Sequence, residues 1–221
     1  MVIISGVHVI NLGFVNSYLL EEPESLTLID CGIPLSAGKI TAYIKSIGRP
    51  VKDLKKILIT HSDADHIGSL AYLKRISGAK VYSSAVEAVG IKRGKPTRMV
   101  KFRGMIKVLV ALISLVVKIK PVEVDNLIAD NEEIPVLGGI TAIDTAGHTP
   151  GHMSYYLKSF KVLFAGDSII SREDMLYSSR PLLTWDEKKA AAAFQKQKMI
   201  SPEIVCCGHG EVMKEAGKKF A

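Results

Sequence analysis

Short runs of β-branched and aromatic residues predict several strands in the first part of the chain. The runs occupy residues 2–4, 17–20, 26–29, 56–59 and 80–83, and turn-forming Gly, Asn or Pro residues separate the earliest of them. Apolar residues recur at helical spacing in residues 35–47, before Gly48 and Pro50, and in residues 67–76, before Gly78. Strands and helices therefore alternate in this part of the chain.

The second half has a related order of elements without a close sequence repeat. Strand-like runs lie at residues 140–143, 153–157, 161–164 and 204–207, and helices are expected at residues 186–198 and 211–219. The matching order favours an α/β (α+β) fold in which two sheets pack together and helices cover them outside. With 221 residues, 48% of them apolar, we expect a single domain over residues 1–221.

A basic and apolar insertion at about residues 91–125 separates the two halves. Residues 91–120 contain nine Lys or Arg and no Asp or Glu, so they account for the formal charge of +7 and the rest is slightly acidic. Nucleic acid is therefore not an expected partner. The apolar stretch at residues 108–117 is about half as long as a bilayer-spanning helix. We expect a buried helix or a lid; the alternative is a homodimer or peripheral membrane contact through residues 105–119.

The start of the chain and its cysteines favour a cytoplasmic location. No cationic region precedes the apolar residues 1–14, so we do not expect a signal peptide. Cys31, Cys206 and Cys207 are an odd number of cysteines beside apolar strand residues, which is typical of buried thiols in a reducing compartment. His8, in an apolar strand, is expected to have a structural role.

The densest chemical signal is the segment Thr-His-Ser-Asp-Ala-Asp-His-Ile-Gly at residues 60–68. His61, Asp63, Asp65 and His66 are four candidate metal ligands within six residues. On a helix Asp63 would point away from the face that positions 61 and 65 share, whereas a loop at a strand end lets all four converge. Imidazole and carboxylate together suit zinc, iron or manganese. A polar helix cap is the alternative for this segment taken alone.

Together with four distant motifs, this segment resembles the metallo-β-lactamase superfamily, whose motif is His-x-His-x-Asp-His after a buried strand. The other motifs are Leu-Ile-Asp-Cys-Gly at residues 28–32, Thr-Ala-Gly-His-Thr-Pro-Gly at 145–151, Phe-Ala-Gly-Asp at 164–167 and Gly-His-Gly at 208–210. They follow the order of the family and cover nearly the whole chain. The resemblance implies a four-layer αββα sandwich and a metal-dependent hydrolase.

The resemblance also implies two divalent metal ions, zinc first among them. The ligands would form two triads and a bridge: His61, Asp63 and His148; Asp65, His66 and His209; and Asp167, with a hydroxide also bridging. Asp65 would in addition accept a proton from the bridging water or pass one to the leaving group. Asp30 would orient a ligand histidine, with a role as a strand-end turn residue as the alternative.

Asp63 departs from the family pattern, because the superfamily most often has histidine there. A carboxylate oxygen lies as many bonds from the backbone as an imidazole Nδ1, so Asp63 can reach the same ion. With the additional negative charge of Asp63, the formal charges of two divalent ions, three carboxylates and one hydroxide sum to about zero. We therefore expect a weaker preference for zinc, with manganese or iron as the alternatives.

Several polar residues beside these motifs are candidate substrate contacts. His152 lies four residues after His148, and Arg172, Tyr177 and Arg180 follow Asp167 on an expected loop. A role in supporting the ligands, or at the solvated surface, is the alternative for each.

The leading functional interpretation is hydrolysis of an ester, thioester, lactone or amide in a small molecule. Similarity to hydroxyacylglutathione hydrolases, the glyoxalase II-like branch, favours thioesters. A phosphodiesterase is an alternative that the basic segment favours. A di-iron oxidoreductase is another, because flavin-linked di-iron relatives have an acid at the position of Asp63. A binding module without activity is disfavoured, because every ligand position holds a competent ligand.

Overall fold

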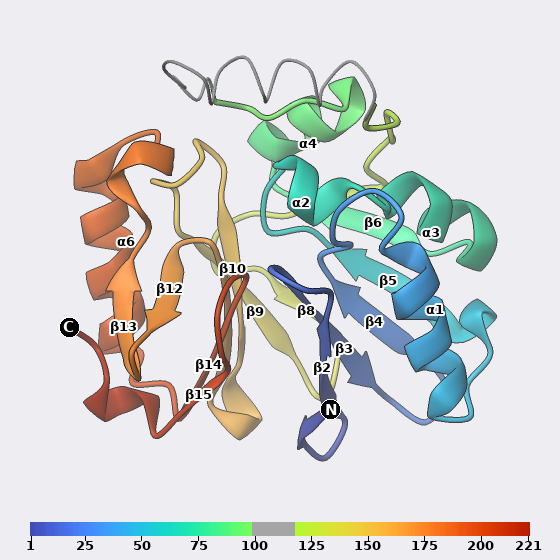
Figure 1. Ribbon diagram of the computed structural model, residues 1–221, viewed down its shortest axis with the longest axis horizontal. Helices are drawn as coiled ribbons and strands as arrows, with labels where there is room; N and C mark the ends of the chain where they lie inside the picture. Colours follow the sequence, from blue (N-terminus) through green and yellow to red (C-terminus); the bar gives the residue numbers. More distant parts are fainter. Residues whose placement is uncertain (99–117) are drawn as a thin grey trace.

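Two β-sheets pack face to face, with helices on the outer side of each (Figure 1). The computed structural model describes residues 1–98 and 118–221. The first sheet has seven strands in the order β1 to β7, and the second has six in the order β15-β14-β11-β10-β9-β8. This arrangement is the αββα sandwich expected from the sequence.

The first half of the chain builds the seven-stranded sheet and the helices beside it. Its strands are β1 Val2–Ile4, β2 Val7–Asn11, β3 Asn16–Glu21, β4 Leu26–Ile29, β5 Leu54–Leu58, β6 Lys80–Ser83 and β7 Asn126–Leu127. Its helices are α1 Ala37–Ser46, α2 Ala64–Ile67, α3 Leu70–Ser77 and α4 Ala85–Arg93. Strands β1 to β4 pair antiparallel, whereas β4 to β7 pair parallel.

The second half builds the other sheet. Its strands are β8 Glu133–Ile134, β9 Ile140–Asp144, β10 Met153–Leu157, β11 Val162–Gly166, β14 Ile204–Cys207 and β15 Met213–Lys214, and a separate hairpin is formed by β12 Ile169–Arg172 and β13 Met175–Ser178. Helix α6, Glu187–Met199, covers the outer side of this sheet (Figure 1). Short 3-10 helices lie at Val51–Asp53, Lys158–Phe160, Pro181–Leu183 and Ala216–Lys218.

The core has three layers because the central strands are buried on both faces. In β3, Leu19 packs with the helices of the first half, whereas Leu20 packs between the two sheets. In β11, Phe164 lies between the sheets and Leu163 faces α6. Successive strand residues point to opposite faces, so a strand covered on both sides reads as an unbroken apolar run. This explains why residues 26–29 and 161–164 show no apolar and polar alternation.

The strand directions bring distant motifs to one edge of the sandwich. Strand β4 is parallel to β5, and β11 is parallel to β14. Strand β9 runs in the same direction as β11, because each of them is antiparallel to β10. The carboxyl ends of neighbouring parallel strands meet at one edge, which is where α/β proteins place their sites. The segments that follow these strands contain all the predicted metal ligands.

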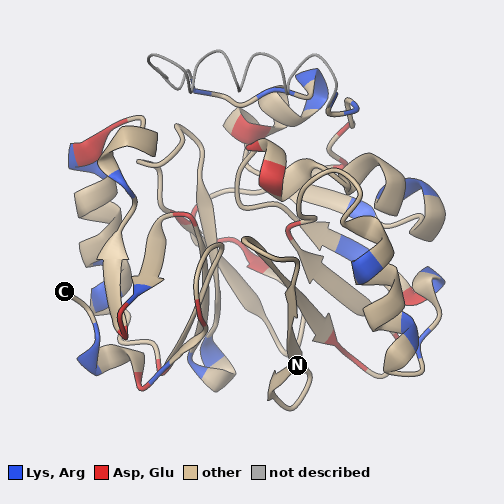
Figure 2. Ribbon diagram, viewed as in Figure 1, with Lys and Arg blue, Asp and Glu red and all other residues tan. Residues whose placement is uncertain are grey.

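Charged residues follow the same layering (Figure 2). Lys and Arg residues lie on α1, α3 and α6, on the outside of the molecule, whereas most positions of the two sheets in the middle are uncharged. The three cysteines are free and fully buried, as expected from their strand neighbours. Burial raises the pKa of the Cys31 and Cys206 thiols well above the usual range.

Two predictions of secondary structure were wrong, and a third was confirmed with different bounds. The helix expected at residues 67–76 begins earlier and divides into α2 and α3 around Gly68. The helix expected at 211–219 is strand β15 followed by a 3-10 turn, because the edge of β14 offers backbone partners to Met213 and Lys214. The loop expected after Asp167 contains the β12–β13 hairpin, whose turn residues Glu173 and Asp174 both have positive φ.

Part of the basic insertion lies outside the described residues. The expected lid, the apolar stretch at residues 108–117 and most of the segment 105–119 lie there, so the homodimer and peripheral membrane contacts stay predictions. Within residues 1–98 and 118–221, no helix has both the length and the apolar character to cross a membrane.

Gly68 provides a test of how tightly α2 is docked. Its conformation suits alanine, but a Cβ there would lie 2.3 Å from the backbone nitrogen of Pro34. Gly68→Ala should therefore lower the free energy of unfolding by about 1–3 kcal/mol, as overpacking does. Urea unfolding measures the change. A Cβ at Gly38, on α1, meets no atom within 4 Å, so Gly38→Ala should be neutral or stabilising by up to about 1 kcal/mol. Equal midpoints for both variants would contradict this.

Candidate metal centre

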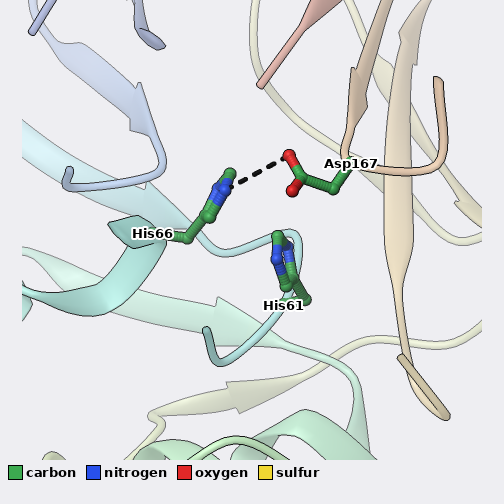
Figure 3. A group of neighbouring side chains, drawn as sticks. All are labelled: His61, His66 and Asp167. Atoms are coloured by element: carbon green, nitrogen blue, oxygen red, sulfur yellow. Dashed lines mark ion pairs between the residues drawn. The ribbon is translucent and has the colours of Figure 1, made fainter. Parts of the chain in front are cut away.

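All seven predicted ligands lie together at the edge where β4, β5, β9, β11 and β14 end. Three groups have ligand atoms within 4.8 Å of one another: His61, Asp63 and His148, hereafter the first triad; Asp65, His66 and His209, the second triad; and His61, His66 and Asp167. His61 and His66 come from the first half of the chain, and Asp167 faces them from the second (Figure 3). The structure thus unites residues that are far apart in sequence.

The segment after β5 is part loop and part helix. The sequence favoured a loop for all of it, but Asp65 and His66 lie in the first turn of α2. Asp63 precedes this helix in an extended conformation, and its carbonyl accepts a hydrogen bond of 2.9 Å from the His66 backbone. The change of backbone conformation at Asp63 directs it to the first triad, while Asp65 and His66 belong to the second.

Asp30 fixes the orientation of two ligand histidines. Its Oδ2 lies 2.8 Å from His66 Nδ1 and accepts a hydrogen bond of 2.7 Å from Thr60 Oγ1. Because that hydroxyl donates to Asp30, it can accept from His61 Nδ1, which lies 2.9 Å away. With both Nδ1 atoms engaged, the Nε2 atoms of His61 and His66 face the centre. Asp30 therefore lies where a residue that orients ligands has to be.

The remaining two histidines are held differently. Nδ1 of His209 lies 2.5 Å from the carbonyl oxygen of Phe14, and its Nε2 lies 3.2 Å from Asp65 and 3.3 Å from Asp167. His148 Nδ1 has no hydrogen-bond partner among the described residues. The ring of His148 is thus less restrained than the other three.

Opposite charges shift the pKa values of the centre strongly. Burial lowers the pKa of His66, but Asp167, Asp30 and Asp65 outweigh it and hold the value well above normal. Burial likewise lowers the pKa of His209, yet Asp167 and Asp65 raise it to about 10. Burial would raise the pKa of Asp167, and the neighbouring His66 and His209 instead keep it well below its usual range. The carboxylates therefore stay ionised and require cations beside them.

The centre fits a divalent cation. His61 Nε2, His66 Nε2 and Asp167 Oδ1 are buried polar atoms without a hydrogen-bond partner among the described residues. They nevertheless face one another, with His66 Nε2 only 3.3 Å from Asp167 Oδ1 (Figure 3). Unpaired buried polar atoms are costly, and one cation would satisfy all three. A donor set of imidazole and carboxylate suits zinc, manganese or iron.

A cavity of about 640 Å³ opens onto the centre. Its walls combine metal-ligand candidates with apolar and basic side chains. Those lining it outside the ligands include Phe14, Pro96, Arg98, Ile170, Arg180 and Leu183. Its volume is in the range of small-molecule sites.

Three of the four candidate substrate contacts do not line this cavity. His152 is fully buried: its Nε2 accepts a hydrogen bond of 3.1 Å from the Asp167 backbone, and its Nδ1 lies 2.8 Å from Thr145 Oγ1. His152 therefore holds Asp167 in place instead of meeting substrate. Arg172 is exposed on β12, with its guanidinium 5.3 Å from the Tyr177 ring centre, away from the cavity. Arg180 does line it.

Sequence reasoning missed three residues of the centre. Thr60 links His61 to Asp30, and Arg98 contacts the first triad. The buried Glu87 accepts a hydrogen bond from the backbone nitrogen of Ser62, the residue after His61. The place of Thr60 between a predicted strand and a predicted ligand could have indicated its role. Arg98 and Glu87 gave no such signal, because each is one charged residue among many on or near a basic helix.

The chain belongs to the metallo-beta-lactamase superfamily, whose family model matches residues 10–209. It is 31% identical to the probable metallo-hydrolase YflN of Bacillus subtilis (strain 168), over 97% of this chain and 87% of that protein. A metallo-beta-lactamase family protein of Thermus thermophilus superposes with a TM-score of 0.76 at 20% identity, over 99% of this chain and 78% of that one. The latter likeness shows the fold alone.

A hydroxyacylglutathione hydrolase of Ectopseudomonas mendocina is 29% identical over 70% of this chain, but the match spans only 47% of that enzyme. The fold, the family and the His/Asp cluster together define a metallo-hydrolase of the metallo-β-lactamase fold.

Asp30→Asn should weaken metal binding without unfolding the chain. The amide keeps the shape but loses the charge that favours the Nδ1 protons of His66 and His61, and changes of this kind cost about 10- to 100-fold in metal affinity. Competition with a chromophoric chelator measures the affinity for zinc. Asp53→Asn, which removes only an ion pair with Arg49, is the matched control. Unchanged affinity in Asp30→Asn would contradict the assigned role.

Loading the metal-free protein at pH 7 should release protons. His66 and His209 hold protons there, because their pKa values are raised, to about 10 for His209. Only neutral imidazole ligates a metal, so ions entering the second triad displace roughly two protons per chain. The affinity should accordingly rise between pH 7 and 10. Calorimetric titrations in buffers of different ionisation enthalpy count the protons, and a count of zero would refute the protonated state.

Proposed function

We propose that this chain is a hydrolase with a dinuclear metal centre that acts on an ester, thioester, lactone or amide bond of a small molecule. One observation carries the proposal: Asp167 lies 3.6 Å from His148 of the first triad and 3.3 Å from His66 and His209 of the second, and a cavity opens onto this group of ligands. One ion would be held by the first triad and the other by the second, with Asp167 between them.

The bound ions would lower the pKa of a coordinated water and polarise the carbonyl oxygen under attack. The protein supplies the geometry and the proton transfer. The side chain of Asp65 lies 3.2 Å from His209 Nε2 and lines the cavity. A carboxylate in this position can accept a proton from the attacking water and pass it to the leaving group. Neither step requires a nucleophilic side chain.

His152 and Asp30 support the chemistry from behind the ligands. The backbone nitrogen of Asp167 is held by His152, so the carboxylate of Asp167 keeps its place between the triads. The oxygens of Asp30 hold Thr60 and His66. Ligands fixed before the substrate arrives lose little entropy in the reaction, which is how a preorganised site accelerates it.

The walls of the cavity support a substrate with an apolar part and an acidic group. Phe14, Ile170 and Leu183 provide apolar surface beside the metal ligands. Arg98 and Arg180 provide positive charge on the same walls, which suits a carboxylate or phosphate group. A thioester with a carboxylate is consequently the first substrate to test. The partial match to a hydroxyacylglutathione hydrolase agrees with this choice.

Zinc is the first metal to test, and manganese and iron follow. Asp63 gives the first triad a carboxylate in place of a neutral imidazole, which favours harder ions. The three buried free thiols support a reducing, cytoplasmic location.

Phosphodiester cleavage is the second candidate function. It is favoured by Arg98 and Arg180, which line the cavity, because a guanidinium binds phosphate oxygens with two parallel hydrogen bonds. Thioester, lactone, β-lactam and bis-nitrophenyl phosphate substrates, each with zinc, manganese and iron, distinguish the candidates. If only the phosphodiester is hydrolysed, phosphodiester cleavage replaces acyl hydrolysis as the proposed function.

Asp65→Ala and His148→Ala should each abolish most of the turnover. The first removes a ligand and the proton acceptor, and the second removes a ligand of the first triad, so we expect kcat to fall at least about 10²-fold. Steady-state kinetics with the best substrate of the screen measure the loss. Asp174→Asn, at the exposed tip of the β12–β13 hairpin, is the control and should match the wild type. Full turnover in both ligand variants would refute the mechanism.

A further inference from the structure

Arg98 places a positive charge directly against the first triad. Its side chain is only 4% exposed. Its Nη2 donates hydrogen bonds to Asp63 Oδ2 and to His148 Nε2, the latter at 3.0 Å. Because a guanidinium carries the same charge sign as a metal ion, its presence here disfavours an ion in the first triad.

The two atoms that Arg98 contacts are those that an ion in the first triad would need. Asp63 Oδ2 lies 3.6 Å from His61 Nε2 and 3.4 Å from His148 Nε2, so these three atoms converge on one point. A neutral imidazole nitrogen has a single lone pair. When the lone pair of His148 Nε2 accepts a hydrogen bond from Arg98, it cannot bind a metal ion. The two occupants therefore exclude each other at His148.

The position of Arg98 is held by a second buried network. The hydroxyl of the preceding residue, Thr97, donates to the Glu87 carboxylate at 2.9 Å. The same carboxylate accepts hydrogen bonds from Ser62, between two ligands of the first triad, and from the Gly151 backbone, which follows His148 closely. Glu87 is fully buried. The segment that carries Arg98 is thus fixed by the carboxylate that also holds both loops of the first triad.

At the second triad the competitors that the described residues provide are the protons of His66 and His209 and not a side-chain cation. Within the described residues, no lysine or arginine pairs with Asp65, and the Nδ1 atoms of His66 and His209 are both engaged. His148 of the first triad, in contrast, has an Nδ1 without a partner in the part of the chain that the structure describes. The second triad is accordingly preorganised for an ion once its two histidines release their protons, whereas the first is less restrained and has to lose a guanidinium from two of its ligand atoms.

Charge balance is compatible with a single bound ion. The carboxylates of Asp63, Asp65 and Asp167 carry three negative charges, and one divalent ion together with the Arg98 guanidinium supplies three positive ones. A second divalent ion adds charge that has to be compensated by a hydroxide or an anionic substrate. The three carboxylates can thus be neutralised without a metal ion in the first triad.

We propose that Arg98 competes with the metal ion for the first triad, so that the chain holds one ion tightly at the second triad and a second ion weakly. This rests on the proposed function, because it presupposes metal at both triads. The ion enters the first triad only when Arg98 leaves Asp63 and His148, and the displaced guanidinium remains on the wall of the cavity.

Titration of the metal-free chain with Mn²⁺, followed by electron paramagnetic resonance, tests this directly. The wild type should show one tight and one weak ion, with affinities that differ by at least roughly tenfold, since a charged hydrogen bond must be broken for the second. Arg98→Met should strengthen the weak ion by a similar factor and leave the tight one unchanged. Arg180→Met removes an arginine that lines the cavity but contacts neither triad, and it should leave the affinities of both ions unchanged.

Two further variants make the result unambiguous. Asp65→Asn should remove the tight ion and thereby assign it to the second triad. Should Arg98→Met fail to fold, Arg98→Gln retains polar contacts without the charge and provides the same comparison.

The outcomes separate the inference from the function on which it rests. Two equally tight ions in the wild type, or an unchanged weak ion in Arg98→Met and Arg98→Gln, would overturn the competition and leave the dinuclear hydrolase intact. A wild-type chain that binds less than one ion would reject the dinuclear proposal and the competition together.

Discussion

The buried carboxylate of Asp30 is the interaction on which the metal centre depends. It lies at the end of β4 in a left-handed backbone conformation, with φ 58°. From there it accepts hydrogen bonds from the Thr60 backbone and hydroxyl after β5, and it lies 2.8 Å from His66 in α2. One side chain thus fixes three consecutive segments and the rings of two histidines. The strain at Asp30 is compensated by these contacts, as is common where structure is arranged for function.

The second constraint is the concentration of negative charge at the edge of the sandwich. Asp63 and Asp167 remain ionised despite their burial, because cationic groups surround them. A buried charge without a partner is unstable, so each carboxylate needs a proton on a neighbouring imidazole, a guanidinium or a metal ion. The structure shows the first two of these within a few ångströms, and the ligand set could hold the third. Protonated His66 and His209 serve the second triad, and Arg98 serves the first.

Membership of the superfamily accounts for the fold and the metal ligands, whereas the cavity determines which substrate fits. The superfamily explains why two sheets present their strand ends to one edge and why histidines and aspartates gather there. The substrate is decided by the cavity walls, which are formed by loops and by the hairpin β12–β13. Loops vary more readily than the scaffold that carries them. Similarity of fold to proteins named β-lactamases therefore does not by itself assign a β-lactam substrate.

The sequence by itself determined the order of most strands and helices and indicated four candidate ligands at residues 61–66, and the motifs that resemble the superfamily added His148, Asp167 and His209. Those predictions rest on local information: the apolar runs of β4 and β11, the helical spacing in α1, and short motifs around His61, His148 and Asp167. The sequence also showed the departure at Asp63, because an aspartate stands there in place of the histidine of the superfamily motif.

Only the tertiary structure decided which other side chains reach the centre. His152 is buried behind Asp167, although its place beside His148 made it a candidate for substrate contact. Arg98 lies 50 residues from His148 and touches it, and the edge of β14 turns a predicted helix into β15. The position of each of these residues depends on which distant segment of the chain packs against it. Periodicity and motif spacing describe a residue's neighbours along the chain, whereas these contacts are fixed by the register and packing of elements far apart in it.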